Sequence, residues 1–381
     1  MAVAPFREAI DAVALAGGEA LKQCYQCGLC TGTCPWNLVK DFPTRKLIHQ
    51  AQLGIVDFES EDTWTCATCR ACVARCPRGV AIIDIMRALR NIVAEMGAGH
   101  LPDSLRVTLK NIAGTGNPLG EPAERRTAWI NSPEVTPVTK DAEILYFSCC
   151  IPAYDPNVQR VARSTAKVLH KAGVRFAVIG ARESCCGESV RKSGNESLFQ
   201  KLAQSNIAAF AESGVNKIVV TSPHCYYTFK NEYPKLGGNF EVIHYTEFMA
   251  QLIKDGRLKP TKAVDAKVTY HDPCYLGRHS GVYDAPREVL KSIPGVELVE
   301  MPDYGPDSIC CGGGGGRIWM ETKKGERLSD LRLDQAAGTG ASVLAAACPY
   351  CILNFEDSIL TTDRPGRIAV KDISELLAES L

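Results

Sequence analysis

The residues best able to do chemistry in this 381-residue chain are its 18 cysteines. They fall into two groups, eight between Cys24 and Cys76 and ten between Cys149 and Cys351. The N-terminus has no basic segment followed by an apolar core, so no secretory signal is expected. Thiols in the cytoplasm stay reduced, and structural disulfides are therefore not predicted. So many thiols instead indicate binding of metal ions or iron–sulfur clusters.

The first group contains two copies of the spacing Cys-x2-Cys-x2-Cys-x3-Cys-Pro. The copies are Cys24, Cys27, Cys30 and Cys34, then Cys66, Cys69, Cys72 and Cys76. This spacing is the ligand run of bacterial ferredoxins, whose fourth cysteine serves the neighbouring cluster. We predict one [4Fe-4S] cubane on Cys24, Cys27, Cys30 and Cys76, and another on Cys66, Cys69, Cys72 and Cys34. Zinc knuckles are disfavoured because they do not need the fourth cysteine and its proline.

The second group of cysteines is itself repeated. Cys150 and Cys274 are 124 residues apart, Cys185 and Cys310 are 125 apart, and Cys225 and Cys351 are 126 apart. Two copies of a unit of about 125 residues are the simplest explanation.

The second copy carries Cys310-Cys311-Gly312 and Cys348-Pro-Tyr-Cys351 and resembles the CCG signature of heterodisulfide reductases. With the ferredoxin motifs in front, the chain resembles the D-type subunit of that family. It is similar also to the K-type subunit of sulfite-reduction complexes and to the iron–sulfur subunits of glycolate oxidase and anaerobic glycerol-3-phosphate dehydrogenase. The resemblance implies a catalytic noncubane [4Fe-4S] cluster on Cys274, Cys310, Cys311, Cys348 and Cys351. Glycines 312–316 are expected to let the backbone approach this cluster and turn into a helix.

The first copy departs from the signature, because Ser222 stands where the first cysteine of Cys-Pro-x-Cys is expected. The candidate metal ligands here are Cys149, Cys150, Cys185, Cys186 and Cys225, for a further iron–sulfur cluster or zinc. Cys149 is expected at the strand end beside Cys150, where consecutive side chains point to opposite faces, so only one of the two should reach a given metal without local distortion. We therefore expect a structural or relay site in this copy.

Three histidines adjoin these cysteines, namely His224, His271 and His279. They are predicted to orient loops or to donate hydrogen bonds to cluster sulfurs, and proton donation to a thiolate product is the alternative.

The pattern of apolar residues predicts an α+β multidomain fold with four segments. Residues 1–98 form an all-helical ferredoxin domain with two [4Fe-4S] clusters, and residues 99–141 a linker rich in proline and glycine. Residues 142–262 and 263–381 form two tandem α/β CCG repeats, the first degenerate and the second complete. Strands are expected at residues 144–147, 176–179, 218–220, 242–243, 268–270, 297–299 and 343–346. Helices are expected at residues 158–172, 198–213, 286–292 and 373–380.

The balance of charges, with 43 basic and 43 acidic residues, gives no footprint for nucleic acid. No apolar run reaches the ~20 residues of a membrane span. We expect a cytoplasmic oxidoreductase subunit, membrane-associated through a partner and active within a hetero-oligomeric complex. It would pass electrons through two cubanes to the noncubane cluster, which reduces a disulfide-type substrate. Its partners would be a flavoprotein, a membrane-bound cytochrome or a quinone-interacting subunit. The alternative is a pure relay between a flavoprotein dehydrogenase, of the electron-transfer-flavoprotein or 2-hydroxy acid type, and quinone or another carrier.

Overall fold

The computed structural model describes residues 5–131, 135–362 and 368–381, which form two compact units. Unit 1 is the chain up to Leu109 together with two short segments, Gly187–Phe199 and Gly312–Leu328. Unit 2 is the rest of the chain. Each short segment of unit 1 begins directly after a Cys-Cys pair of unit 2, so the chain leaves each CCG motif toward the ferredoxin motifs.

Unit 1 is helical and contains no strand among its described residues. Its helices are α1 (Arg7–Val13), α2 (Leu29–Gly32), α3 (Thr44–Leu53), α4 (Asp62–Thr65), α5 (Ala71–Ala74), α6 (Ile82–Met96) and α10 (Glu188–Lys192). Helix α6 supplies much of the core, since Ile85, Met86 and Leu89 are fully buried along one face. It ends at Gly97, whose left-handed backbone is the usual helix stop.

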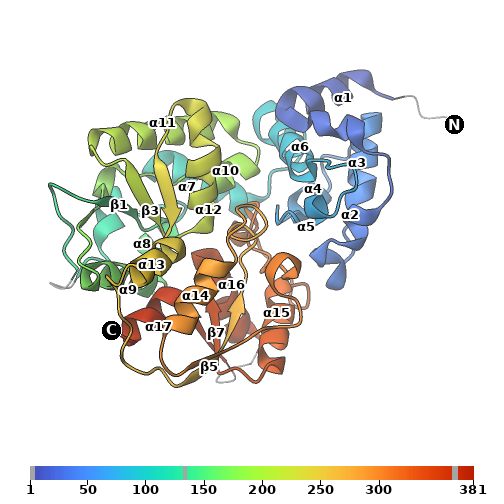
Figure 1. Cartoon of the computed structure of the whole chain (residues 1–381). Coiled ribbons are helices and arrows are strands. Elements are labelled where there is room, and N and C mark those ends of the chain that lie inside the picture. Colours follow the sequence, from blue (N-terminus) through green and yellow to red (C-terminus); the bar gives the residue numbers. More distant parts are fainter. Residues whose placement is uncertain (1–4, 132–134, 363–367) are drawn as a thin grey trace. The chain divides into compact units, whose positions relative to one another are not determined.

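Unit 2 contains two four-stranded parallel sheets of identical topology (Figure 1). The first has the order β2-β1-β3-β4, from β1 (Ile144–Phe147), β2 (Phe176–Ala177), β3 (Lys217–Val220) and β4 (Glu241–His244). The second has the order β6-β5-β7-β8, from β5 (Ala266–His271), β6 (Val296–Val299), β7 (Val343–Ala346) and β8 (Ala369–Asp372). The predicted strands and the tandem repeat are therefore confirmed, and β8 is a strand that the sequence did not predict.

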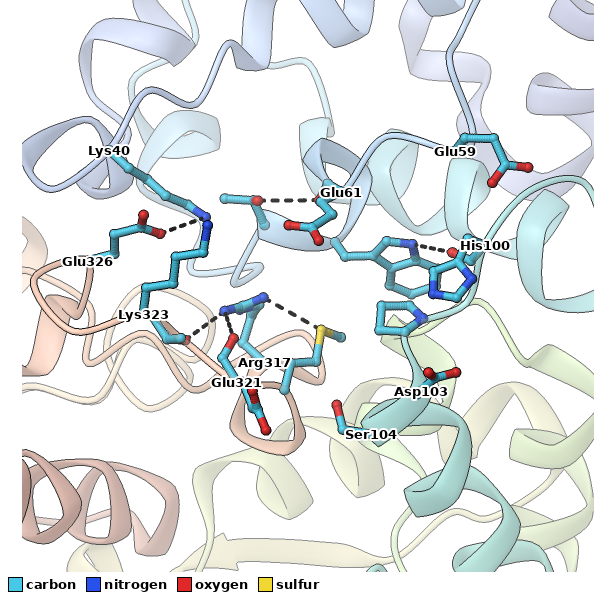
Figure 2. Close-up of a pocket in the computed structure, with 15 residues that line it drawn as sticks. Lys40, Glu59, Glu61, His100, Asp103, Ser104, Arg317, Glu321, Lys323 and Glu326 are labelled. Carbon is cyan, nitrogen blue, oxygen red and sulfur yellow. Dashed lines mark hydrogen bonds and ion pairs between the residues drawn. The ribbon is translucent and has the colours of Figure 1, made fainter.

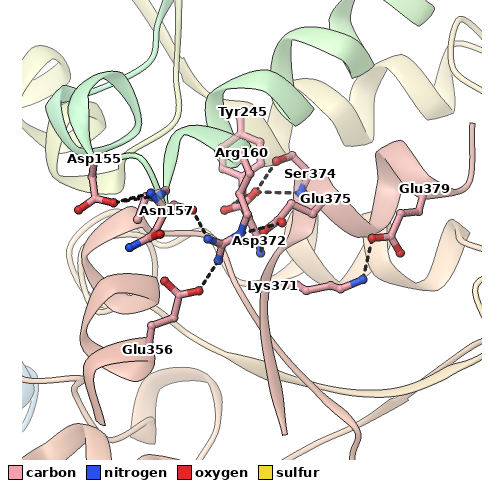
Figure 3. A network of polar contacts seen from close by, with 11 residues as sticks. Asp155, Asn157, Arg160, Tyr245, Glu356, Lys371, Asp372, Ser374, Glu375 and Glu379 are labelled. Carbon is pink, nitrogen blue, oxygen red and sulfur yellow. Dashed lines mark hydrogen bonds and ion pairs between the residues drawn. The ribbon is translucent and has the colours of Figure 1, made fainter. Parts of the chain in front are cut away.

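The helices of unit 2 join the two repeats reciprocally. They are α8 (Cys150–Tyr154), α9 (Gln159–Lys171), α11 (Glu196–Glu212), which begins in unit 1, α12 (Pro223–Asn231), α13 (Tyr245–Lys254), α14 (Asp284–Ser292), α15 (Leu328–Gly338), α16 (Pro349–Thr361) and α17 (Ile373–Glu379). Helix α13 of the first repeat packs on α14 of the second, and α17 of the second packs on α9 of the first. Figure 3 shows Arg160 of α9 between Glu356 and Glu375 of the second repeat, with its Nε 2.9 Å from the Glu375 carboxylate.

Two local expectations were wrong. The segment expected to be a linker contains helix α7 (Asp103–Thr115), which begins in unit 1 and ends in unit 2. The glycine run is followed by a single 3-10 turn at Arg317–Trp319, and the next α-helix begins only at Leu328.

Candidate functional site: three groups of cysteines

The eight ferredoxin-type cysteines line two separate cavities of unit 1. One cavity, named the first cubane site after the cluster predicted for it, is lined by Cys24, Cys27, Cys30 and Cys76. The other, the second cubane site, is lined by Cys34, Cys66, Cys69 and Cys72. Each run thus contributes three cysteines to one cavity and its fourth, proline-followed cysteine to the other.

The two loops that carry these cysteines share one backbone conformation. Gln26 and Gly28 have φ values of 67° and 86°, and Thr68 and Arg70 have φ values of 48° and 68° at the same offsets in the second run. A left-handed β-branched residue such as Thr68 is a conformational outlier. Turns of this kind point backbone N–H groups inward, and the Thr68 N–H donates to the Cys66 sulfur over 3.4 Å.

The chemistry of both cavities suits a cationic iron–sulfur group. Burial raises the pKa of the Cys72 thiol, and the neighbouring thiols Cys66 and Cys69 raise it further. Burial, then Cys69 and Cys66, likewise raise the pKa of Cys34. Thiols that crowd together in this way cannot ionise jointly without a cation, and a soft iron–sulfide group is what four thiolates prefer.

The five cysteines of the second repeat lie on the segments that follow β5, β6 and β7, at the carboxyl-terminal edge of the sheet. They are all buried, and their sulfurs form two sets: Cys274 with Cys310 at 3.9 Å, and Cys351 with Cys311 at 3.3 Å. Cys348 contacts Cys351. Burial would raise the pKa of Cys348, but hydrogen bonds from Cys351 and His224 lower it to about 5. Parallel sheets commonly bind ligands at this edge.

The three histidines take different roles around this site. His271 offers a ring nitrogen within 4.8 Å of the Cys311 and Cys351 sulfurs. Arg332 donates to His271 Nδ1 over 3.2 Å, so the neutral ring carries its proton on Nε2. Burial and Arg332 together hold the pKa of His271 well below its usual range. The ring is therefore neutral, with Nε2–H as its remaining donor.

His224 belongs to the first repeat but lies against the second. Its ring stacks on Tyr275 at 4.0 Å and tilts against Tyr350 at 4.5 Å. His279 also stacks on Tyr275, at 4.0 Å and nearly parallel. The two repeats thus share one aromatic stack beside Cys348, and His279 is part of it.

The five cysteines of the first repeat form two sets, and the strand end expected at Cys149 is not found there. Strand β1 ends at Phe147, and Cys150 already begins helix α8, so the alternation of a strand does not apply. Cys149 adopts φ 71° and ψ 160°, and its side chain hydrogen-bonds with Cys225, as does that of Cys186. Cys149 therefore lies with Cys186 and Cys225, and Cys150 lies with Cys185.

Cys150 pairs with Cys185 and faces a buried cation that the sequence did not predict. Arg126 donates from Nε to Glu183 over 2.8 Å and from a terminal nitrogen to the Cys150 sulfur over 3.5 Å. The arginine side chain and the glutamate are nearly inaccessible to solvent. No spacing in the sequence marks Arg126, because its partners are distant in the chain.

A second buried cation, Arg90 of α6, connects the segments of unit 1. Its guanidinium donates to the Thr63 carbonyl at 2.9 Å and the Cys66 carbonyl at 2.7 Å. It also donates to the Lys192 carbonyl at 3.0 Å and the Gly315 carbonyl at 2.8 Å. One side chain therefore holds the loop of Cys66 and the two segments that follow the CCG motifs. Arg90 lies on the apolar face of its helix, which is a sequence signal that could have been noticed.

The glycine run approaches a different site from the one expected. A Cβ on Gly314 would lie 2.4 Å from the Ala67 carbonyl oxygen, and one on Gly315 would lie 2.8 Å from that of Cys66. The bare backbone of this run thus packs on the ligand loop of the second cubane site.

Beyond the glycines, the chain borders a cavity of about 470 Å³ within unit 1 (Figure 2). Arg317 lines it and stacks on Trp36, which itself lines the second cubane site, at 5.5 Å. Burial and the nearby Arg90 lower the pKa of Arg317 to about 10. No predicted site residue lines this cavity.

Comparisons with known proteins agree with this arrangement. The cysteine-rich CCG domain matches residues 144–230 and again 268–356, and the 4Fe-4S dicluster domain matches residues 20–80. The chain is 32% identical over 394 residues to the D-type subunit of the dihydromethanophenazine:CoB–CoM heterodisulfide reductase of Methanosarcina barkeri, covering 95% of this chain and 94% of that relative. The chain belongs to the family of D-type heterodisulfide reductase subunits.

Two further relatives are more similar in sequence but longer. The chain is 39% identical over 330 residues to the probable iron–sulfur-binding oxidoreductase FadF of Bacillus subtilis. It is 38% identical over 339 residues to the EtfAB:quinone oxidoreductase of Syntrophomonas wolfei. Each match covers 84% of this chain and 47% of the relative, so the chain spans about half the length of these proteins. The family consists of iron–sulfur electron-transfer proteins, and no helix in the described ranges has the length and apolarity needed to cross a membrane.

Proposed function

We propose that the chain is the electron-transfer subunit of an oxidoreductase complex and that the two cubane sites and the cysteines of the second repeat hold its redox groups. The first and second cubane sites would each hold a [4Fe-4S] cubane, and the second repeat a noncubane [4Fe-4S] cluster. Such clusters supply one-electron oxidation and reduction. The observation that supports this most strongly is the sorting of the eight ferredoxin-type cysteines into two cavities of four.

The protein residues around these sites exclude water and set the local electrostatics. Trp36, Phe42 and Ile83 wall the second cubane site. Backbone N–H groups such as that of Thr68 donate to ligand sulfurs, which stabilises the more negative, reduced state.

For the second repeat, we propose reduction of a disulfide-type substrate. The complete CCG signature supports this, because the first repeat has Ser222 where the second repeat has Cys348. His224 would hold the Cys348 sulfur in its anionic form from across the boundary between repeats. The chain is expected to act only within a complex that contains a flavoprotein, a membrane-bound cytochrome or a quinone-interacting subunit.

The test is a Cys311→Ala variant in the anaerobically purified complex. We expect loss of the noncubane EPR signal and of disulfide reductase activity, while both cubanes remain reducible by dithionite. Full disulfide reductase activity in this variant would refute the assignment of the substrate site.

A second candidate is a pure relay between a flavoprotein dehydrogenase and quinone. Two observations favour it: the similarity to an EtfAB:quinone oxidoreductase, and the burial of the second-repeat cysteines, of which the most accessible, Cys274, is 6% exposed. A relay predicts that the purified complex reduces a quinone at the same rate with or without a disulfide and consumes no disulfide. Stoichiometric disulfide consumption would exclude it.

For the first repeat, we propose a structural or relay role for the group at Cys149, Cys150, Cys185, Cys186 and Cys225. These thiols would bind a further iron–sulfur cluster or zinc. Metal analysis of the whole chain with the second repeat intact would test this.

A further inference from the structure

The two cubane sites differ in their access to solvent. Cys27 of the first site is exposed, and Cys24 and Cys76 are partly exposed. In the second site Cys66 and Cys69 are buried and Cys34 and Cys72 are partly exposed, so the first site differs in having one exposed cysteine. An electron carrier on another protein can therefore come close to the first site through Cys27.

The chain that carries the ligands of the two cubane sites is basic, although the whole protein is neutral. The two ligand-bearing stretches, residues 20–46 and 63–83, contain seven basic residues and one acidic residue. Arg45 lies directly over the ligand loop, since a Cβ on Gly28 would be 3.5 Å from its Cδ. Arg78 follows Cys76-Pro77 and is close enough to act electrostatically on Tyr25.

These cations are available for a partner. Lys22, Arg45 and Arg78 are exposed, and none of them has an acidic partner among the residues that the structure describes. A cluster of unpaired like charges has no stabilising role within the chain, because like charges repel each other.

The middle of this basic area is apolar. Tyr25 and Leu29 flank Cys27 in the sequence and are 59% and 44% exposed. An apolar centre with a charged rim is the usual anatomy of a transient protein interface. Both residues sit on a tight ligand loop, whereas a membrane-surface anchor is normally an amphipathic helix.

We propose that Lys22, Tyr25, Leu29, Arg45 and Arg78 form a basic docking face for an electron-carrier protein with acidic residues around its own redox centre. One electron would leave the reduced carrier and enter the first cubane site, so the carrier is oxidised and the site reduced by one electron, with no proton moved. This inference rests on the proposed electron-transfer function and adds the chemistry of the partner.

The experiment uses the full chain with its clusters, and a small acidic ferredoxin as the probe. The ferredoxin is reduced beforehand and freed of reductant, and the rate of cluster reduction is followed by stopped-flow absorbance. Opposite charges raise association rates by about 10- to 1000-fold at low ionic strength, and salt screens this effect. We therefore expect a wild-type rate that falls steeply with salt, and a rate at least about tenfold lower in Arg45→Glu/Arg78→Glu.

A matched control places the same kind of change elsewhere in unit 1. Arg7 is exposed, and the adjoining Phe6 N–H bonds to the carbonyl of Leu53 at the C-terminal end of α3. Arg45 lies at the other end of that helix, roughly 12 Å away along its axis. Arg7→Glu should keep the wild-type rate, and the methyl viologen radical should reduce all variants at least as fast as wild type.

Each remaining outcome decides the question. Equal ferredoxin rates in the two charge-reversal variants, or a salt-independent wild-type rate, would overturn the docking face. Two other results would also overturn it. In each, Arg45→Glu/Arg78→Glu leaves the ferredoxin rate unchanged but abolishes either binding to phosphatidylserine vesicles or dimerisation of the chain. If methyl viologen cannot reduce the second-repeat cluster through the cubanes, the proposed function fails, whatever the ferredoxin result.

Discussion

Arg90 offers the sharpest test of how the structure connects the second cubane site with the chain that follows each CCG motif. Its guanidinium is completely buried and donates to four carbonyl oxygens from three separate segments. It also lies over the Trp64 ring at 5.3 Å. Replacing it with methionine keeps most of the side-chain volume but leaves these carbonyls without their charged donor.

The expected cost follows from the hydrogen bonds that are lost. Breaking a buried charged network costs about 3–5 kcal/mol, because the remaining polar groups stay buried without partners. At 1.4 kcal/mol per factor of ten, local opening should become roughly 100- to 4000-fold more frequent. Arg90→Lys keeps the charge but reaches fewer carbonyls, so its effect should be intermediate.

Hydrogen exchange measured by mass spectrometry resolves this effect by segment, which a global melting curve of a two-unit protein would not. We expect faster exchange in Gly187–Phe199 and Gly312–Leu328 together. Asn91 provides the control, since it donates a single neutral hydrogen bond to the Gly194 carbonyl at 2.7 Å. Asn91→Ala should cost about 1 kcal/mol and affect the first of these segments alone. Unchanged protection of Gly312–Leu328 in Arg90→Met would refute the reasoning.

Three further predictions concern other parts of the chain. Cys76→Ser should perturb the EPR signal of the cubane at Cys24, and a change confined to the other cubane would contradict the sorting of the cysteines. Gly314→Ala forces a Cβ to within 2.4 Å of the Ala67 carbonyl oxygen, and the overpacking should cost about 1–3 kcal/mol, measurable as faster exchange after residue 312. Burial lowers the pKa of His244 from 6.5 to about 3. The unfolded chain therefore takes up this proton first, and stability is lost as the pH falls from 6.5 toward 3. Between pH 7 and pH 5 the wild type should lose about 2 kcal/mol of stability, and His244→Asn should not. The exchange of helix α13 in the variant, compared with wild type, should therefore be slower at pH 5 than at pH 7.

The parts of the fold that the sequence predicts well depend on short-range patterns. Cysteines three residues apart must share a tight loop, and strands of four apolar residues between helices indicate a parallel sheet. The loops that follow the strands of a parallel sheet all lie at its carboxyl-terminal edge, so the topology places the cysteines after β5 and β7 at the same edge.

The parts that the sequence did not predict depend on contacts between distant segments. The glycine run could be identified as a close-approach segment, but its neighbour, the Cys66 loop, is almost 250 residues away. The roles of Arg90 and Arg126 could not be predicted for the same reason, because the carbonyl and carboxylate groups that they bind come from distant parts of the sequence. Strand alternation failed at Cys149 because the strand ends two residues earlier, at Phe147.

The backbone at Cys149 leads to a last prediction, in which stability and metal binding change in opposite directions. Its φ of 71° and ψ of 160° lie in a region that is essentially restricted to glycine and costs about 1–3 kcal/mol for other residues. This backbone conformation directs the Cys149 thiol toward Cys225. We infer that metal binding at this site compensates for the strain. Cys149→Gly should stabilise the metal-free chain by about 1–3 kcal/mol and yet lose the metal of the first repeat. Cys149→Ala should lose the metal and keep the strain. Iron and zinc analysis of the whole chain, beside urea unfolding of the metal-free variants, checks both effects. If Cys149→Ala retains the full metal content, Cys149 is not a ligand, and four thiols suffice for this site.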